Sequence, residues 1–297
     1  MLTYIAAYDG TDASRAAVRF AVDLARAEDA QVIAAHVFPD MRPTHLRSAL
    51  PAADIALQED ARNAGQAVLD GLEADGVSRR VLLCGAPARA LHDLAVAERA
   101  SLLSVGVTHH EHLGRLIPGS VGAKLLHGAP CPVAAVPATA ANRVSAVGVA
   151  YDGAPESRRA LAMAARLAST TGARLVLIGA IELPPYAGPA LATAWDVEPA
   201  VREALEDDMR EAAHQLAVAD AETVVVDGPA GPAVAEAARD RVDLLVTGSR
   251  GYGPLRTVLV GSVSRHLVDN AHCPVLVVPR TSESEVDSEP KTAVARA

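Results

Sequence analysis

Residues 248–262 read GSRGYGPLRTVLVGS, in which two residues separate Gly248 from Gly251 and nine separate Gly251 from the pair Gly261-Ser262. An apolar run precedes this segment, and residues with helical periodicity follow it. The pattern predicts a strand that ends in a glycine turn, a crossing loop, and a helix that begins at the Gly-Ser pair. Such a helix start suits phosphate, because its backbone N–H groups are unpaired and glycine lets an anion approach them closely. Ser262 is expected either to cap the helix or to donate its hydroxyl to a phosphate oxygen.

The spacing differs from two well-known phosphate motifs. The chain holds no Gly-Lys-Ser or Gly-Lys-Thr triplet, so the segment is not a Walker A loop. No third glycine follows Gly253 at the distance that a dinucleotide fingerprint requires. Taken alone, the segment is equally compatible with an ordinary connection between a strand and a helix.

A second copy of the pattern lies upstream and favours the phosphate interpretation. Equivalent positions stand 142 or 143 residues apart, and they are Gly106 and Gly248, Gly119 and Gly261, Ser120 and Ser262, and Asp9 and Asp152. Each aspartate lies in the same Ala-Tyr-Asp-Gly context. The chain is therefore interpreted as a tandem duplication, with domains predicted at residues 1–140 and 144–280. Residues 281–297 are rich in Ser and Glu and are predicted to form a disordered tail.

Composition indicates how each half folds. Half of the 297 residues are hydrophobic but only 3% are aromatic, which favours a core of Ala, Val and Leu, as in a parallel sheet covered by helices. Apolar runs and helical patterns alternate strictly in both halves, which predicts an α/β fold built from right-handed βαβ units. Such sheets bind ligands beyond the carboxyl ends of their strands. Asp9 and Gly106 are predicted to lie at the ends of the first and fourth strands.

Several classes of protein are excluded or disfavoured. A net charge of −9 argues against nucleic-acid binding, and no apolar run reaches the length of a membrane span. The amino-terminal residues lack the pattern of a signal peptide, so a cytoplasmic protein is expected. The three cysteines include no Cys-x-x-Cys pair, and no metal site is predicted. A run of potential metal ligands lies at residues 109–112, namely His109, His110, Glu111 and His112. A solvated polar loop is favoured there over a metal site.

With the repeat, both Asp-Gly turns and the glycine loop, the chain resembles the universal stress protein family in its tandem form, over about residues 1–138 and 144–280. The endings APCPV at residues 129–133 and AHCPVLVVP at residues 271–279 are also typical of that family. The resemblance implies two doubly wound domains of the adenine nucleotide alpha hydrolase-like fold. Each would contain a five-stranded parallel sheet of order 3-2-1-4-5 and bind ATP, with or without Mg²⁺, where the strand order reverses.

The resemblance also implies site residues. In the second half, Asp152 would contact the nucleoside and the backbone near Ala180 would contact adenine. The phosphates would be held by Gly248, Gly251, Gly261 and Ser262. The first half matches at Asp9, Val37, Gly106, Gly119 and Ser120. His109 stands where the second loop glycine is expected, so weaker nucleotide binding is predicted in the first half.

The family resemblance further implies that the fifth strands, residues 132–136 and 274–278, pair with each other as a pseudo-dimer within the chain. A homodimer of whole chains is also expected. Three functions stay open: a nucleotide-binding stress module without rapid turnover or with slow ATP hydrolysis, an enzyme such as a nucleotidyl transferase or an ATP-pyrophosphate ligase, and an interaction protein with vestigial sites. The module is favoured. The focal loop holds no acidic residue for metal-assisted phosphoryl transfer, and the turns after the first strands lack the motifs that the two enzyme classes need.

Overall fold

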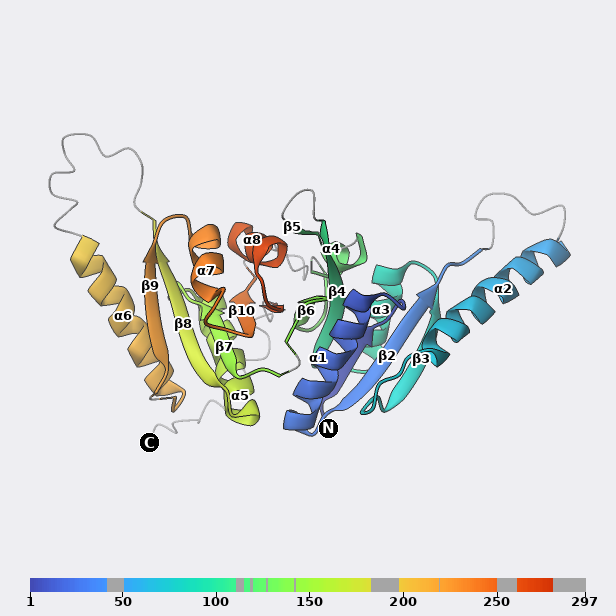
Figure 1. Ribbon diagram of the computed structural model, residues 1–297, viewed down its shortest axis with the longest axis horizontal. Coiled ribbons are helices and arrows are strands. Elements are labelled where there is room, and N and C mark those ends of the chain that lie inside the picture. The colour runs from blue at the N-terminus through green and yellow to red at the C-terminus, as the bar shows by residue number, and fades with distance from the viewer. Residues whose placement is uncertain are drawn as a thin grey trace, which may run out of the picture.

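The computed structural model describes residues 1–41, 51–110, 115–117, 120–126, 128–141, 143–182, 198–218, 220–249 and 261–279. The strands in these residues join into one sheet that runs through both halves of the chain (Figure 1). Of the predicted site residues, Gly119 and Gly251 lie outside the described residues, as does the predicted tail at residues 281–297.

The first half alternates strands and helices as its sequence pattern indicates. Its elements are β1 (Thr3–Ala7), α1 (Asp12–Glu28), β2 (Gln31–Phe38), α2 (Pro51–Asp70), β3 (Arg79–Cys84), α3 (Pro87–Ala97), β4 (Leu102–His110), β5 (Arg115–Ile117), α4 (Ser120–Leu126) and β6 (Val133–Pro137). The parallel strands lie in the order β3-β2-β1-β4-β6. This is the predicted order 3-2-1-4-5, with β5 as an addition.

The second half repeats the arrangement. Its elements are β7 (Ala146–Ala150), α5 (Pro155–Thr171), β8 (Arg174–Ile181), α6 (Glu198–Gln215), β9 (Glu222–Asp227), α7 (Ala230–Ala238), β10 (Leu244–Gly248), α8 (Ser262–Asn270) and β11 (Val275–Val278). The parallel order β9-β8-β7-β10-β11 is again 3-2-1-4-5. The predicted fold class is therefore confirmed in both halves.

The two halves meet through their last strands. β6 and β11 pair antiparallel, with Leu276 opposite Ala134 and Val277 opposite Val133. This pairing confirms the predicted pseudo-dimer within the chain. It also covers two strand edges that would otherwise present unpaired backbone groups to solvent. Figure 1 shows the halves side by side, with β6 and β11 between them.

Helices cover both faces of the sheet, and a separate hydrophobic core lies between the helices and the sheet on each face. One layer packs α1, α2, α5 and α6 against the sheet, and the other packs α3, α4, α7 and α8. The cores consist mainly of Ala, Val and Leu, as the scarcity of aromatic residues predicts. Helices α1 and α5 also contact each other across the seam between the halves. The sheet and the helices that cover it are therefore continuous across both halves.

Local sequence explains where α1 and α5 begin and end. Thr11 caps α1, because its side chain accepts a hydrogen bond from the Ser14 N–H at 3.2 Å. Pro155 occupies the first helical position of α5, where proline costs no hydrogen bond. Gly172 ends that helix in the left-handed conformation, with φ of 68°. Both helices therefore begin directly after the Asp-Gly turns.

One expectation for the first half is wrong. The sequence predicted that its fourth strand ends at Gly106 and that a solvated polar loop follows, but β4 continues to His110 and pairs antiparallel with β5. Val107 and Thr108 are β-branched, and no glycine interrupts the run, so the extended conformation propagates. β5 in turn contacts α8 of the other half. In the second half, β10 ends at Gly248.

Candidate functional site

The Asp152 turn lies at the carboxyl end of β7 and is held by short-range hydrogen bonds. The Ala154 N–H donates to Asp152 Oδ1 at 3.1 Å, and the Asp152 N–H donates to Ser157 Oγ at 3.3 Å. The Ser157 hydroxyl donates to the Ala154 carbonyl at 2.9 Å. Gly153 adopts φ of 75°, a region that favours glycine. The turn thus places an exposed carboxylate at the start of α5.

The Asp9 turn in the first half repeats this geometry with one addition. Thr11 donates to Asp9 Oδ1 through its N–H at 3.0 Å and through its hydroxyl at 2.6 Å. Burial raises the pKa of Asp9, but the hydrogen bonds from Thr11 and Ser14 outweigh it, so the pKa lies below its usual value. The second half has Ala154 at the position of Thr11 and so supplies no hydroxyl there. The first-half carboxylate is therefore more fully engaged by its own turn.

Packing requires glycine at Gly106, which lies within β4, and at Gly248, the last residue of β10. A Cβ atom at Gly248 would lie 2.4 Å from the Glu156 carbonyl oxygen, and one at Gly106 would lie 2.5 Å from the Ala13 carbonyl carbon. These backbone atoms belong to the first turns of α5 and α1. Glycine therefore lets each helix start directly against the end of the neighbouring strand. Both glycines were predicted from the sequence to admit phosphate, and this packing role was not predicted.

The start of α8 is tied to the end of β10. The buried Ser264 donates through its hydroxyl to the Gly248 carbonyl at 2.7 Å, and its Oγ lies 3.3 Å from Thr247 Oγ1. In the first half, Gly122 and Val105 occupy the equivalent positions and offer no hydroxyl groups. The second half alone has this side-chain link between the strand end and the helix start. This link was not predicted from the sequence, although the two halves differ at both of these positions.

Helix α8 begins without a side-chain cap. Gly261 is the N-cap residue, with φ of −63° and ψ of 164°, and it can offer no side-chain hydrogen bond. Ser262 is the first helical residue and is exposed, so the expectation that it caps the helix is wrong. A cap belongs to the residue before the first helical position, which is glycine here. The amide groups of this first turn therefore lack the side-chain acceptor that a serine cap would supply.

Ala180 and Val37 lie near the carboxyl ends of β8 and β2. Ala180 pairs with Val226 of β9, and Val37 pairs with Leu83 of β3. Ala150, the last residue of β7, stands opposite Ile178, so Ala180 lies beside the turn that follows β7 and holds Asp152. The structure thus brings Asp152, Ala180, Gly248 and Gly261 to one edge of the sheet. Of the first-half candidates, Asp9, Val37 and Gly106 lie at the equivalent edge, and the backbone of Ser120 begins α4.

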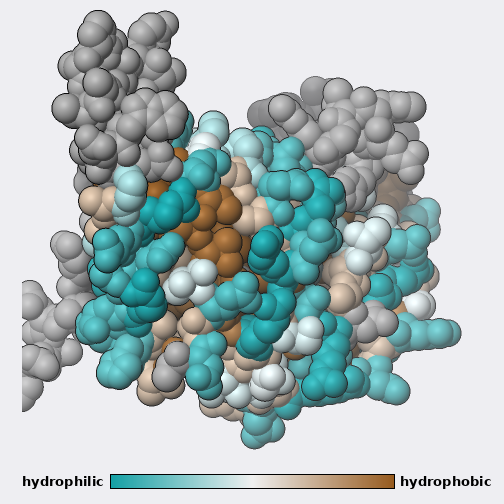
Figure 2. Space-filling model, turned by 60° about the vertical axis from the view of Figure 1, so that its left-hand side comes forward, coloured by the Kyte–Doolittle hydropathy of each residue, from teal (hydrophilic) through white to brown (hydrophobic). Residues whose placement is uncertain are grey.

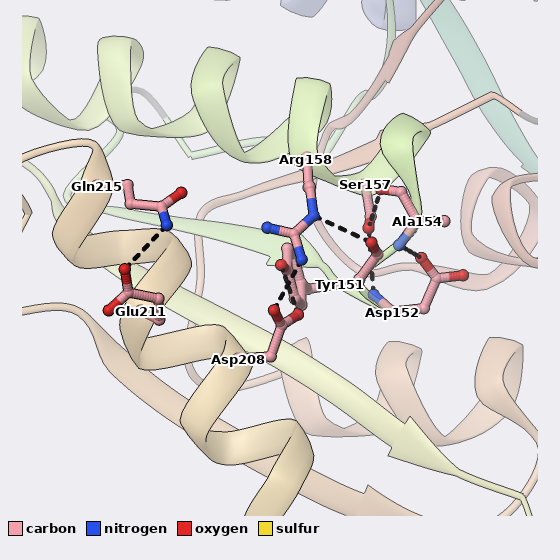
Figure 3. Close-up of polar contacts among 9 residues, drawn as sticks. Tyr151, Asp152, Ala154, Ser157, Arg158, Asp208, Glu211 and Gln215 are labelled. Atoms are coloured by element: carbon pink, nitrogen blue, oxygen red, sulfur yellow. Dashed lines mark hydrogen bonds and ion pairs between the residues drawn. The ribbon is translucent and has the colours of Figure 1, made fainter.

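Three side chains that the sequence argument did not select surround the Asp152 turn. The Tyr151 hydroxyl donates to Asp208 Oδ2 at 2.8 Å, and Arg158 Nη2 donates to Asp208 Oδ1 at 2.7 Å. Arg158 Nε also donates to the Gly153 carbonyl at 3.1 Å. Figure 3 shows Tyr151, Arg158 and Asp208 pointing toward one another, whereas the Asp152 side chain points away from them. Burial and the hydrogen bond to Asp208 raise the pKa of Tyr151.

One face of the molecule is mostly polar. Figure 2 shows hydrophilic side chains over most of one face and a single conspicuous patch of hydrophobic ones between them. Within the described residues, no helix is long and apolar enough to cross a membrane. The same residues contain no group of three or more His, Cys, Asp or Glu side chains placed to hold a metal ion. The run from His109 to His112 falls partly outside the described residues.

Comparisons with known proteins agree with the repeat. A family model described as the universal stress protein family matches the chain twice, over residues 3–137 and 144–279. A universal stress protein of Thermus aquaticus is 35% identical over 139 residues, which cover 44% of this chain and 95% of that protein. One of Mycobacterium tuberculosis is 31% identical over 192 residues, 61% of this chain and 63% of that protein.

A solved structure shows the same fold over nearly the whole chain. A universal stress protein from Archaeoglobus fulgidus DSM 4304 aligns with a TM-score of 0.69, covering 94% of this chain and 98% of its own. The two sequences are 20% identical. This likeness therefore concerns the arrangement of strands and helices in both halves.

Proposed function

This chain belongs to the universal stress protein family, in the form with two such domains in one polypeptide, and we propose on this basis that its second half binds an adenine nucleotide. The observation that carries the proposal is the set of contacts at one sheet edge. The Asp152 turn leads into α5, the first turn of α5 packs on Gly248, and Ser264 ties Gly248 to the start of α8. A nucleoside contact and a phosphate contact are thereby held in one rigid unit.

The chemistry of these groups suits an adenine nucleotide, for which we propose ATP, with Mg²⁺ carried by its phosphates. The exposed Asp152 carboxylate is an acceptor for a nucleoside hydroxyl, and the backbone near Ala180 faces the place for adenine. The uncapped start of α8 offers amide donors and the positive end of a helix dipole to phosphate oxygens. AMP, ADP or a cyclic nucleotide would use the same donors, so these groups do not fix the number of phosphates in the ligand.

The first half is proposed to bind nucleotide more weakly. β4 continues past Gly106 to His110, and the position equivalent to His109 in the second half is Gly251. Asp9 accepts two hydrogen bonds from Thr11, which compete with a ligand hydroxyl. The link from Ser264 to Gly248 also has no counterpart, since Gly122 lacks a hydroxyl. The Thr11 bonds make Asp9 less available to a ligand hydroxyl, and the other two differences lower the preorganisation of the phosphate end of that half.

We further propose a regulatory role in stress response without rapid turnover, in the cytoplasm, by a chain that associates as a homodimer. Rapid phosphoryl transfer needs carboxylates to hold metal ions and a group to position the nucleophile. Among the described residues at this sheet edge, Asp152 is the carboxylate of the turn, and its Oδ1 already accepts the Ala154 N–H. Slow hydrolysis and a pure interaction role are the alternatives that the following titration separates.

The test is calorimetric titration of Mg²⁺-ATP into nucleotide-stripped protein, wild type beside Gly261→Glu. The new carboxylate would repel phosphate at the start of α8. The variant should still fold, because the φ of −63° at Gly261 suits any residue and a negative charge is favourable at a helix start. We expect saturable binding in wild type and loss of second-half binding in the variant.

Gly119→Glu is the matched control, because it makes the same change at the equivalent position of the first half. We expect it to leave the main binding event unchanged. A stoichiometry near two in wild type would show that both halves bind. Absence of any binding in wild type would overturn the nucleotide proposal and favour the interaction role, and a steady release of ADP and phosphate would favour the slow ATPase.

A further inference from the structure

Tyr151, Arg158 and Asp208 form a cluster, here called the clamp, that joins three elements of the second half. Tyr151 follows β7, Arg158 lies in the first turn of α5, and Asp208 lies on α6. Both Asp208 oxygens are used, one by the Tyr151 hydroxyl at 2.8 Å and one by Arg158 Nη2 at 2.7 Å. The guanidinium also lies 5.9 Å from the centre of the Tyr151 ring.

The clamp holds the residues on both sides of Asp152. Tyr151, which precedes it, is only 3% exposed and packs in the core layer with α5 and α6. Gly153, which follows it, has its carbonyl fixed by Arg158 Nε at 3.1 Å. The backbone of Asp152 is thus anchored from the core side while its carboxylate stays exposed (Figure 3). The clamp therefore holds the backbone that carries this carboxylate, whose Oδ1 also accepts the Ala154 N–H at 3.1 Å.

The turn and the clamp also constrain each other sterically. A Cβ atom at Gly153 would lie 3.1 Å from Asp208 Oδ2, so a side chain there would press on the clamp carboxylate. The φ of 75° at Gly153 excludes most residues independently. The two demands meet at one glycine, which couples the shape of the turn to the position of α6.

The described residues of the first half contain no such cluster. The side chain nearest to a Cβ at Gly10, the equivalent of Gly153, is the apolar Val68 at 3.5 Å, and Arg15, the equivalent of Arg158, pairs with the exposed Asp12 at 3.0 Å. His36 Nδ1 instead donates to the Tyr8 carbonyl at 2.8 Å, from the adjacent strand. The ion-paired clamp thus occurs in the half whose loop matches the phosphate pattern in full.

We propose that Tyr151, Arg158 and Asp208 are positioning residues that preorganise the Asp152 turn for the nucleoside part of the ligand. This inference rests on the proposed function of the second half. A site whose competent arrangement is populated only part of the time binds with an affinity reduced by that fraction. Loss of the clamp lowers this population, and it does so at the nucleoside end of the site, away from the phosphate contacts at α8.

The test compares two ligands in the full chain by calorimetry: Mg²⁺-ATP and inorganic tripolyphosphate, which lacks the nucleoside. Arg158→Gln and Asp208→Asn remove the ion pair, and Tyr151→Phe removes only the hydroxyl. If the competent turn falls to about a tenth of the population, the Kd for ATP rises about tenfold in the first two variants. We expect a smaller rise in Tyr151→Phe and an unchanged Kd for tripolyphosphate throughout.

Arg15→Gln is the matched control, since it breaks the equivalent arginine's exposed pair in the first half and should leave both ligands unaffected. Equal losses for ATP and tripolyphosphate would overturn the inference, because a general loss of structure weakens both. Unchanged ATP binding in all three clamp variants would overturn it while leaving the proposed function intact. Absence of ATP binding in wild type would remove the proposed function and this inference together.

Discussion

At Gly248 and Gly106, the space for a side chain is already filled by the first turns of α5 and α1, with backbone atoms 2.4 and 2.5 Å from the place of a Cβ. Because the atoms in these contacts belong to the backbone, an added side chain could be accommodated only if the backbone moved. Packing by itself therefore explains why both positions are glycine. Their assignment to phosphate approach stays a prediction.

We predict that Gly248→Ala destabilises the chain by about 1–3 kcal/mol, the usual cost of overpacking a core. Equilibrium unfolding in urea measures this loss. Gly128→Ala is the control, because its nearest atom, the Lys124 carbonyl oxygen, lies 3.9 Å from the added Cβ. An unfolding midpoint for Gly248→Ala equal to that of wild type would contradict the packing argument.

At the scale of elements, α1 and α5 are joined across the seam by an ion pair between a buried glutamate and a partly exposed arginine. Glu28 of α1 is 2% exposed, and its Oε1 lies 2.9 Å from Arg166 Nη1 of α5. The Tyr4 hydroxyl of β1 donates to the other carboxylate oxygen. Burial raises the pKa of Glu28, and the nearby Arg166 and Thr170 offset this only in part. The repeat has Thr171 at the position of Glu28, so the pair is not duplicated.

The raised pKa makes a prediction with a definite sign. The folded state holds the Glu28 proton more tightly than the unfolded state, whose pKa is about 4.3. The resulting stabilisation is complete below that value and is lost as pH rises through the folded pKa. The free energy of unfolding of Glu28→Gln, relative to that of wild type, should therefore increase from about pH 4 to about pH 7. Urea unfolding of both proteins at the two pH values measures this change. A constant difference between the two proteins would refute this, and Asp12→Asn at an exposed site is the control.

At the scale of the molecule, the antiparallel pairing of β6 and β11 makes one sheet from two repeats. Separation of the halves would leave β11, which is buried along its whole length, as an open edge. An exposed hydrophobic edge pairs readily with a second copy of itself. We predict that residues 143–280 produced alone form a dimer of about twice the expected mass, because such an interface is self-complementary. Light scattering after gel filtration measures the mass, and a stable monomer would contradict the prediction.

Several features were predictable because each depends on local or repeated sequence. Alternating apolar and helical patterns determined the α/β class, and the family resemblance supplied the strand order and the pairing of the last strands, all of which the structure bears out. The turns at Asp9 and Asp152 follow from glycine and short polar side chains within a few residues. The assignment of site residues stays a prediction, and the titration of Gly261→Glu addresses it.

The sequence by itself therefore determined the repeat, the fold class and the candidate turns, because periodicity, glycine and the capping residues act over short distances. Tertiary structure alone decided the clamp, the link from Ser264 to Gly248 and the seam pair of Glu28 and Arg166. Their partners lie 50, 16 and 138 residues apart in the chain. It also decided how far β4 runs, because β-branched Val107 and Thr108 only favour extended backbone locally and pairing with β5 supplies the partner that carries the strand to His110. Such contacts depend on which faces the fold brings together, and no local pattern encodes that.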